Sequence, residues 1–285
     1  MSFLRGIYGV NSSVISSIKK AGITSPIDYL LSDLEQIAKE GDCSYRELQS
    51  VRSVVTAQLA ALPITGDVLL KDATKSTVVF STGSSRLDAA LGGGVLRSEV
   101  LEVFGKSGVG KTQLCARMAA KQATLGRRVL YLDTAAAIIP SMLMEIFSRL
   151  NAEVTEELLQ LIQVCHPRDI WEAISSLSSV LASSDPPALL VLDSVAAYML
   201  PAVAATQGTG AVCQLSSVLR QIANRSNAVV LLVMHDSDLP HGNVLARIWQ
   251  HVPAIRVEVQ RPEQVSQFRV TKATRLAVNK GFTPV

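Results

Sequence analysis

Hydrophobic positions follow a helical period over the first sixty residues of the chain. In the longest predicted helix, Tyr45–Leu62, one face carries the apolar residues Leu48, Val51, Val55 and Leu59, as expected of a helix that packs against a core. Ser25 followed by Pro26 is typical of a helix start, because proline at the first helical position loses no hydrogen bond. Residues 1–62 are therefore predicted to be a small all-α domain.

Three further signals divide this helical stretch. Capping boxes are predicted at Ser32-x-x-Glu35 and Ser44-x-x-Glu47, and Gly41 stands where a helix would end. The turn at residues 21–23 is similar to the turn of helix-hairpin-helix modules, which either bind phosphate backbones or simply pack two helices together. Nothing in this domain has the pattern of a catalytic site.

Short apolar runs alternate with amphipathic segments from residue 76 onward. We predict strands at 76–81, 128–132, 161–165, 188–192 and 228–234, and helices at 113–125, 141–150, 169–182 and 211–224. Strands that alternate with helices imply a mostly parallel sheet covered on both faces. Residues 252–285 read as short strands and turns of an antiparallel extension. Residues 63–75, with Pro63 and Gly66, are predicted to be a linker, so that an α/β core spans 76–285.

Composition narrows the class of protein. The 285 residues are 48% hydrophobic and 18% charged, which is sufficient for one large core and a small extra domain. Neither a signal peptide nor a membrane span is evident, because Asp193 and Pro201 interrupt the longest apolar stretch. Four cysteines without metal-ligand spacing indicate reduced intracellular thiols: Cys43, Cys115, Cys165 and Cys213.

Charge is uneven along the chain, although the net charge is only +3. Residues 241–285 hold two acidic side chains and seven basic ones, namely Arg247, Arg256, Arg261, Arg269, Lys272, Arg275 and Lys280. Such a segment can follow a phosphate backbone. It can equally be a solvated edge, or supply arginines to the nucleotide of a neighbouring subunit.

The strongest chemical signal is the octet at residues 105–112. An apolar strand runs into GKSGVGKT, which fits the phosphate-binding loop called Walker A. Its glycines let backbone N–H groups approach a phosphate chain, and the following helix N-terminus favours the anion. The predicted nucleotide-binding residues are Gly105, Lys106, Ser107, Gly108, Val109, Gly110, Lys111, Thr112 and Gln113. Lys111 would reach the terminal phosphates, and the Thr112 hydroxyl would hold Mg²⁺.

A second run, ALLVLDS at residues 188–194, completes the nucleotide pattern. Its continuous apolar sequence is typical of a buried parallel strand, and the terminal Asp193 fits the Walker B carboxylate that holds Mg²⁺ through water. Ligands of parallel α/β sheets sit at the carboxyl ends of the strands, where Asp133 and His235 also fall. The sequence therefore predicts ATP and Mg²⁺ as ligands.

These motifs resemble those of the eukaryotic strand-exchange recombinase family, whose core is RecA-like. The resemblance rests on STG (81–83), LD (87–88), GGG (92–94), Glu99, Glu102, GKSGVGKTQ (105–113), YLDT (131–134) and LLVLDSVAAY (189–198). It covers nearly the whole chain. Within the family, the pattern from Arg247 to Arg256 and the late KATR (272–275) are similar to the D-type paralogue.

The resemblance implies a fold, a location and partners. The expected fold is a RecA-like P-loop ATPase core preceded by the helical domain. Members of this kind are nuclear, assemble with sister recombinase paralogues, and assist homologous-recombination repair by acting on recombinase filaments and DNA.

The sequence departs from a hydrolysing member of the family at one catalytic position. In hydrolysing members the strand after Walker A ends in Asp-Thr-Glu, and the glutamate polarises the attacking water. Here these positions are Asp133, Thr134 and Ala135. Since a positioned general base is worth about 10²–10⁴-fold in rate, we expect weak or absent hydrolysis. His235 is the remaining catalytic candidate, although a histidine that caps a strand end is the simpler interpretation.

Two segments at the positions of the DNA-binding loops also depart from the family. Residues 199–210 and about 236–246 contain neither lysine nor arginine, so they should bind single-stranded DNA weakly or only within a complex. Trp249 either stacks on a base or belongs to the core. The linker lacks the family's Phe-x-x-Ala pattern for polymerisation, whereas Val68-Leu69-Leu70 offers an apolar docking segment.

Three hypotheses follow. The first is an ATP-binding, weakly hydrolysing or non-hydrolysing subunit of a heteromeric repair complex. The second is an ATPase that depends on single-stranded DNA and acts on it directly, with water positioned by His235 or a partner. The third, a small-molecule kinase, has the least support, because the sequence offers no arginine-rich lid and no role for the helical domain.

Overall fold

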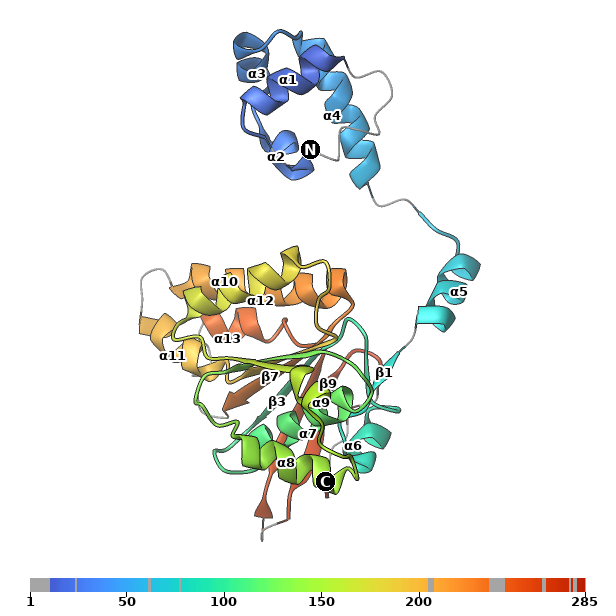
Figure 1. Ribbon diagram of the computed structural model, residues 1–285, viewed down its shortest axis with the longest axis vertical. Coiled ribbons are helices and arrows are strands. Elements are labelled where there is room, and N and C mark those ends of the chain that lie inside the picture. Colours follow the sequence, from blue (N-terminus) through green and yellow to red (C-terminus); the bar gives the residue numbers. More distant parts are fainter. Residues whose placement is uncertain are drawn as a thin grey trace. The chain divides into compact units, whose positions relative to one another are not determined.

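The computed structural model describes residues 11–23, 25–60, 63–76, 78–204, 208–235, 244–262, 265–276, 278 and 281–284. The chain divides into two compact units, residues 1–75 and 76–285, drawn in Figure 1. Each unit is described by itself below.

The first unit is a bundle of short helices around its own apolar core. Its helices are α1 (Ser12–Lys20), α2 (Pro26–Leu31), α3 (Leu34–Glu40) and α4 (Tyr45–Leu59). The core holds Val14, Ile18, Tyr29, Leu34, Ile37, Leu48, Val51 and Val55. The face predicted for α4 is thus buried, apart from Leu59, which is exposed.

The helix starts agree with the predicted signals at two places and differ at one. Ser25 and Ser44 both form capping boxes, with Asp28 and Glu47 as the reciprocal partners. The predicted box at Ser32 is wrong, because Asp33 is the N-cap of α3 and accepts N–H bonds from the next turn. An aspartate beside a serine is an equally strong N-cap, and here it begins the helix one residue later.

The segment predicted as a linker contains a helix, α5 (Gly66–Ser76). Beyond Gly66 the sequence has no helix breaker, and Lys71 pairs with Asp67 one turn away at 3.4 Å, which supports a short helix. Val68, Leu69 and Leu70 lie on α5 and are exposed. The three-part division of the chain itself stays a prediction.

The second unit is built on a mostly parallel sheet, as predicted. The strand order is β10-β9-β8-β3-β7-β6-β4-β5. The parallel strands are β3 (Val100–Gly105), β4 (Val129–Asp133), β5 (Ile162–Cys165), β6 (Leu189–Asp193), β7 (Val229–His235) and β8 (Ile255–Gln260). β9 (Gln267–Ala273) and β10 (Thr283–Pro284) extend it antiparallel. The predicted strand at 76–81 shrinks to β1 (Val79–Phe80), which pairs with β2 (Val95–Leu96).

Helices cover both faces of this sheet (Figure 1). One face carries α6 (Ser85–Ala90), α7 (Lys111–Ala123), α8 (Pro140–Arg149) and α9 (Glu156–Gln160), and the other carries α10 (Ile170–Ala182), α11 (Ala196–Ala204), α12 (Gly208–Ser226) and α13 (Val244–Trp249). Because strand side chains alternate between faces, Leu189 and Val191 of β6 enter the first layer and Leu190 and Leu192 the second. Among the described residues, no helix is both long and apolar enough to cross a membrane.

Candidate nucleotide-binding site

The phosphate-binding loop lies between β3 and α7, at the carboxyl edge of the parallel strands. Gly105 begins it with φ +149°, and a Cβ there would lie 2.2 Å from the carbonyl oxygen of Val259 on β8. Gly108 and Gly110 also have positive φ, and Gly110 is the N-cap of α7. The glycine spacing therefore meets a steric need and opens the loop toward an anion.

Lys111 is the buried cation of this loop, with 5% of its surface exposed. Its ammonium donates to the carbonyl oxygens of Gly105 (2.8 Å) and Lys106 (2.7 Å), and lies 3.4 Å from Nδ1 of His235. Both carbonyl acceptors are neutral, and a charged phosphate oxygen is a stronger acceptor for an ammonium group. The lysine is thus held where a phosphate can take over its bonds.

Asp193 ends β6 beside this loop and is 6% exposed. Burial raises the pKa of its carboxyl group, and hydrogen bonds from Thr112 and Tyr131 partly oppose that rise. The Tyr131 hydroxyl donates to Asp193 Oδ2 at 2.8 Å. The structure therefore brings together Thr112 and Asp193, whose oxygens are the kind that Mg²⁺ prefers.

Asp133 is paired with Asp193 in the sheet register but has a different role. Its carboxylate accepts the backbone N–H groups of Ala135 (3.2 Å) and Ile138 (2.8 Å). This carboxylate holds the turn that follows β4. The main-chain carbonyl oxygen of Asp133 lies 2.9 Å from Nδ1 of His166, a contact that the sequence did not predict.

Ala135 is exposed in the turn after β4. Its side chain offers neither a proton acceptor nor a charge at the position where the resemblance expects glutamate. His235 ends β7 and lies beside Lys111, so it is both a strand end and a neighbour of the phosphate site. Asp236, which follows it, lies outside the described residues.

Tyr131 and Cys115 are two buried polar groups that the sequence reasoning did not place at the site. Burial raises the pKa of both, with the neighbouring carboxylate of Asp193 adding to the rise. The thiol of Cys115 is therefore an unreactive part of the core. The buried phenol of Tyr131 keeps its proton and acts as a hydrogen-bond donor.

A cavity of about 260 Å³ opens next to the first turn of α7. Gln113 and Arg117 of α7, Gly83, and the apolar side of α8 at Met142 and Ile146 line it. It begins one residue beyond Thr112. The cavity thus adjoins the phosphate-binding loop and offers both apolar and hydrogen-bonding walls, the usual composition of a small-molecule site.

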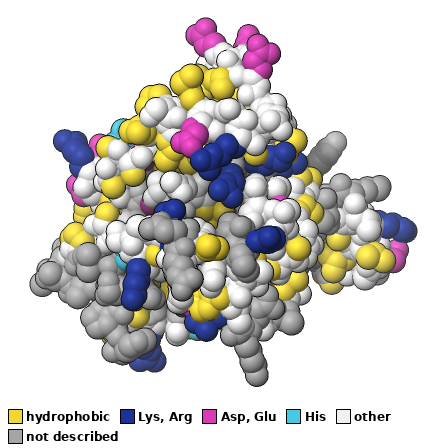
Figure 2. Space-filling view, turned by 90° about the horizontal axis from the view of Figure 1, so that it is seen from below, with side chains coloured by type: hydrophobic (Ala, Val, Ile, Leu, Met, Phe, Trp, Pro, Cys, Tyr) yellow, Lys and Arg dark blue, Asp and Glu magenta, His cyan; other side chains and the backbone are white. Residues whose placement is uncertain are grey.

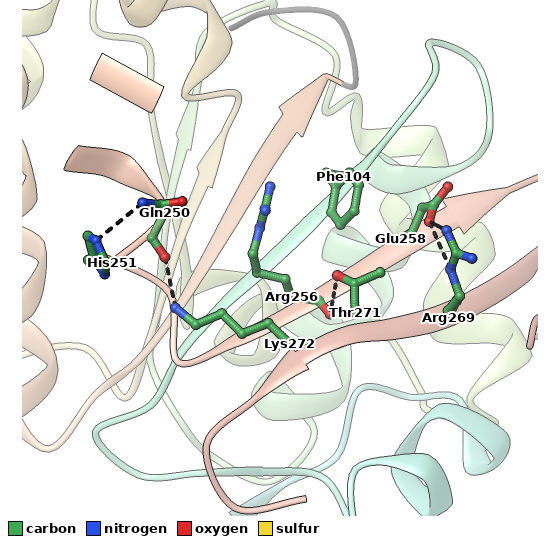
Figure 3. Close-up of a pocket in the computed structure, with 8 residues that line it drawn as sticks. All are labelled: Phe104, Gln250, His251, Arg256, Glu258, Arg269, Thr271 and Lys272. Carbon is green, nitrogen blue, oxygen red and sulfur yellow. Dashed lines mark hydrogen bonds and ion pairs between the residues drawn. The ribbon is translucent and has the colours of Figure 1, made fainter. Parts of the chain in front are cut away.

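Four basic side chains of the tail have partners within the molecule. A larger cavity of about 580 Å³ lies on the open face of β8 and β9 (Figure 3). Arg256 pairs with the buried Glu102 at 2.7 Å and stacks over the Phe104 ring. Arg269 pairs with Glu258, and Lys272 donates to two backbone carbonyls.

Arg275 is held in the same way by Glu99 and by two carbonyl groups. Figure 2 shows basic side chains interspersed with hydrophobic and acidic ones on one face. These four cations therefore have partners within the molecule, and the interpretation of the basic tail as a track for a phosphate backbone stays a prediction. Arg247 is exposed, and Lys280 lies outside the described residues.

Trp249 belongs to the core, so the base-stacking hypothesis is wrong. The side chain is 2% exposed, and its indole N–H donates to Glu102 at 2.7 Å. Residues 199–210, expected to form a loop, lie largely in the helices α11 and α12, and Met199 is buried in the core on that face of the sheet. Most of the second expected loop, 236–246, lies outside the described residues, which resume at Val244 in α13.

The sequence of this chain matches two known protein families. The family described as "Rad51" matches residues 73–259, and "RAD51D, N-terminal domain" matches residues 1–58. The chain belongs to the Rad51 family. The predicted RecA-like fold and the resemblance to the D-type paralogue are both confirmed.

Individual relatives can be aligned with most of this chain. It is 31% identical to DNA repair protein RAD51 homolog 4 of Bos taurus, covering 94% of this chain and 89% of that protein. The Mus musculus protein of the same name is 29% identical over 87% of this chain and 81% of its own length. DNA repair and recombination protein RadA of Metallosphaera sedula is 22% identical over 90% of this chain and 85% of its own length. The chain is thus a Rad51-family protein of DNA recombination and repair.

Proposed function

We propose that this Rad51-family chain is an ATP-binding subunit of a heteromeric recombination-repair complex, with weak or no intrinsic ATP hydrolysis. One observation carries the proposal. The Lys111 ammonium is held at the glycine-rich loop and Thr112 hydrogen-bonds Asp193, which supports nucleotide binding, whereas the neighbouring turn presents Ala135 where a hydrolysing site would need a base.

In this proposal, the loop from Gly105 to Gln113 cradles the phosphates through its N–H groups. Lys111 exchanges its two carbonyl partners for phosphate oxygens, and the Thr112 hydroxyl ligates Mg²⁺. Asp193 holds the same ion through water. The cavity beside Gln113 and Met142 is the place for the nucleoside, because it adjoins the loop and has an apolar wall. Bound Mg²⁺ would neutralise phosphate charge.

ATP then serves chiefly as a structural ligand. A ligand that binds only the folded or assembled state stabilises it by RT ln(1 + [L]/Kd), or about 2.7 kcal/mol at a hundredfold excess over Kd. A slow site suits this role, since hydrolysis would discard the stabilisation. Ala135 supports it, because alanine cannot accept a proton from water.

The partners follow from the same family membership. We infer sister recombinase paralogues as fellow subunits, a recombinase filament as the target and the nucleus as the location. The chain would act through an N-terminal domain (1–62), a linker (63–75) that offers the exposed residues 68–70, and the ATPase core (76–285). Single-stranded DNA would bind weakly or through the complex, because three of the tail arginines, Arg256, Arg269 and Arg275, already pair with carboxylates of the same chain.

A second function, a DNA-dependent ATPase, is favoured by one observation. His235 lies 3.4 Å from the Lys111 ammonium, close to where terminal phosphates would sit. An imidazole there can orient water. A residue from a partner subunit can do the same.

Lys111→Ala tests the clamp role, with Lys106→Ala as a matched control from the exposed side of the same loop. Affinity for a fluorescent ATP analogue and co-purification with a sister paralogue are measured together. We expect Lys111→Ala to weaken both and Lys106→Ala to change the affinity far less. Unchanged partner recovery by Lys111→Ala at saturating ATP would contradict the clamp role.

A further inference from the structure

Tyr131 is a buried polar group that neither a loop motif nor a charge pattern singles out. It lies on β4, is fully buried, and packs in the layer between the sheet and α7. In the register Tyr131 faces Val191, so Asp193 is its diagonal neighbour on the adjacent strand. Side chains two residues apart share a face, and a long aromatic side chain reaches such a diagonal neighbour.

The hydroxyl of Tyr131 meets the carboxylate of Asp193 at Oδ2, 2.8 Å away. A phenol O–H that donates to a carboxylate forms a strong, directional bond. Asp193 also accepts a hydrogen bond from Thr112. The carboxylate is therefore fixed between a rigid buried ring on one side and the hydroxyl of the phosphate-binding loop on the other.

Packing alone does not require this hydroxyl. A phenylalanine would fill the same space in the layer, and a buried tyrosine hydroxyl requires a hydrogen-bond partner. Here that partner is the carboxylate that ends β6, rather than a backbone carbonyl. Tyr198 shows the other arrangement: it is also buried, and its hydroxyl donates to the carbonyl oxygen of Pro167 at 3.4 Å.

We propose that Tyr131 is a positioning residue for the magnesium-bound nucleotide, because its hydroxyl holds Asp193 in the orientation that faces Thr112. This inference rests on the proposed nucleotide function and deepens it. Groups that orient a metal-holding carboxylate typically contribute about 10–100-fold to metal affinity. The contribution belongs to the Mg²⁺-dependent part of binding, since the N–H groups of the loop contact phosphate without the ion.

The test compares Tyr131→Phe with Tyr198→Phe in the full chain. For each protein, the Kd of a non-hydrolysable ATP analogue is measured by titration calorimetry with Mg²⁺ and again with EDTA. We expect Tyr131→Phe to lose about 10-fold or more of the Mg²⁺-dependent gain, with the EDTA affinity unchanged. Tyr198→Phe, which removes an equally buried hydroxyl elsewhere, should keep the wild-type ratio.

Three results would overturn the inference, and they are distinguishable. If the wild-type chain gains affinity with Mg²⁺ and Tyr131→Phe keeps the same ratio, the hydroxyl has only a structural role while the proposed nucleotide function stands. If the wild-type chain binds the analogue equally well with Mg²⁺ and with EDTA, only the positioning inference fails, whereas no binding under either condition means that the nucleotide function fails as well. A thermal melt of each variant accompanies the titration, so that a loss of fold is not read as a loss of affinity.

Discussion

At the scale of single residues, the buried charge of Asp193 is expected to lower the stability of the ligand-free fold while it serves to bind Mg²⁺. The carboxylate is almost fully buried, and burial raises its pKa, which means that the apo fold resists ionising it. Asp193→Asn removes the charge with little change of shape. We expect this variant to melt at about 2–4 °C above the wild type without ligand, the equivalent of about 1 kcal/mol.

The same variant should lose the Mg²⁺-dependent part of its stabilisation by ATP. Differential scanning fluorimetry of the wild type and Asp193→Asn, each with and without ligand, measures both effects. An apo variant that melts below the wild type would show that the buried charge is already compensated. A full ligand shift in the variant would remove Asp193 from the site.

Gly105 carries a second prediction at this scale. A methyl group there would lie 2.2 Å from the backbone carbonyl oxygen of Val259, which cannot move without displacing β8. Gly105→Ala should therefore cost several kcal/mol, as overpacking and strained backbone do together. Gly108→Ala is the matched control, because a Cβ at Gly108 meets nothing within 4 Å and leaves only its positive φ as a cost. Equal midpoints of the two variants in urea would contradict the prediction.

At the scale of elements, Glu102 joins three parts of the second unit. It lies on β3, and it accepts hydrogen bonds from Trp249 at the end of α13 and from Arg256 on β8. Removing one partner of a buried pair costs about 3–5 kcal/mol. Because a third of Arg256 is exposed, we expect about 2–4 kcal/mol for Glu102→Gln.

Urea denaturation measures this cost, and Glu145→Gln is the control. Glu145 pairs with Arg149 on the surface of α8, so its loss should change stability by about 0.5 kcal/mol or less. The intrinsic fluorescence of buried Trp249 offers a second probe of the same unfolding. A Glu102→Gln variant as stable as the Glu145→Gln control would contradict the prediction and mean that water compensates for the loss of the Glu102 charge.

The elements themselves were predictable where their signals are local. The strands β4, β5, β6 and β7 begin and end within about a residue of their predicted bounds, because buried parallel strands are continuous apolar runs. Walker A is a contiguous motif, and it lies at the predicted edge of the sheet. The helix α5 was not predicted, because Pro63 precedes it and Gly66 begins it, and both residues are more typical of a linker than of a helix.

The contacts of the candidate site were not predictable in the same way. Tyr131 meets Asp193 across 62 residues of sequence, and Trp249 meets Glu102 across 147. The strand order makes Tyr131 and Asp193 neighbours, and the packing of α13 against the sheet brings Trp249 to Glu102. Two tail cations show the same limit: Arg256 pairs with Glu102 across 154 residues of sequence, and Arg275 pairs with Glu99 across 176.

At the scale of the whole molecule, the two units have separate hydrophobic cores. We expect two thermal transitions by calorimetry, with ATP and Mg²⁺ raising the midpoint of only the one that belongs to the core at 76–285. A hundredfold excess of ligand over Kd corresponds to about 2.7 kcal/mol, or about 5–10 °C for a domain of this size. An equal shift of both transitions would mean that the units unfold together.

In the proposed function, the core at 76–285 lacks a catalytic base at Ala135, and restoring one is a direct prediction. Ala135→Glu places a carboxylate at the position where hydrolysing family members carry the base. We expect turnover to rise by about 10²-fold or more, measured by phosphate release. Ala135→Gln is the control, because it adds similar bulk without a base. No rise with glutamate would mean that other parts of the hydrolytic machinery are missing too.

The central claim is that this chain binds ATP without turning it over appreciably. It is tested most directly by the ATP turnover of the purified protein, with and without single-stranded DNA, against Lys111→Ala and alongside a binding measurement. The account predicts turnover at the level of Lys111→Ala while the wild type still binds ATP. Turnover clearly above that level, and rising with DNA, would contradict it and make the chain a DNA-dependent ATPase.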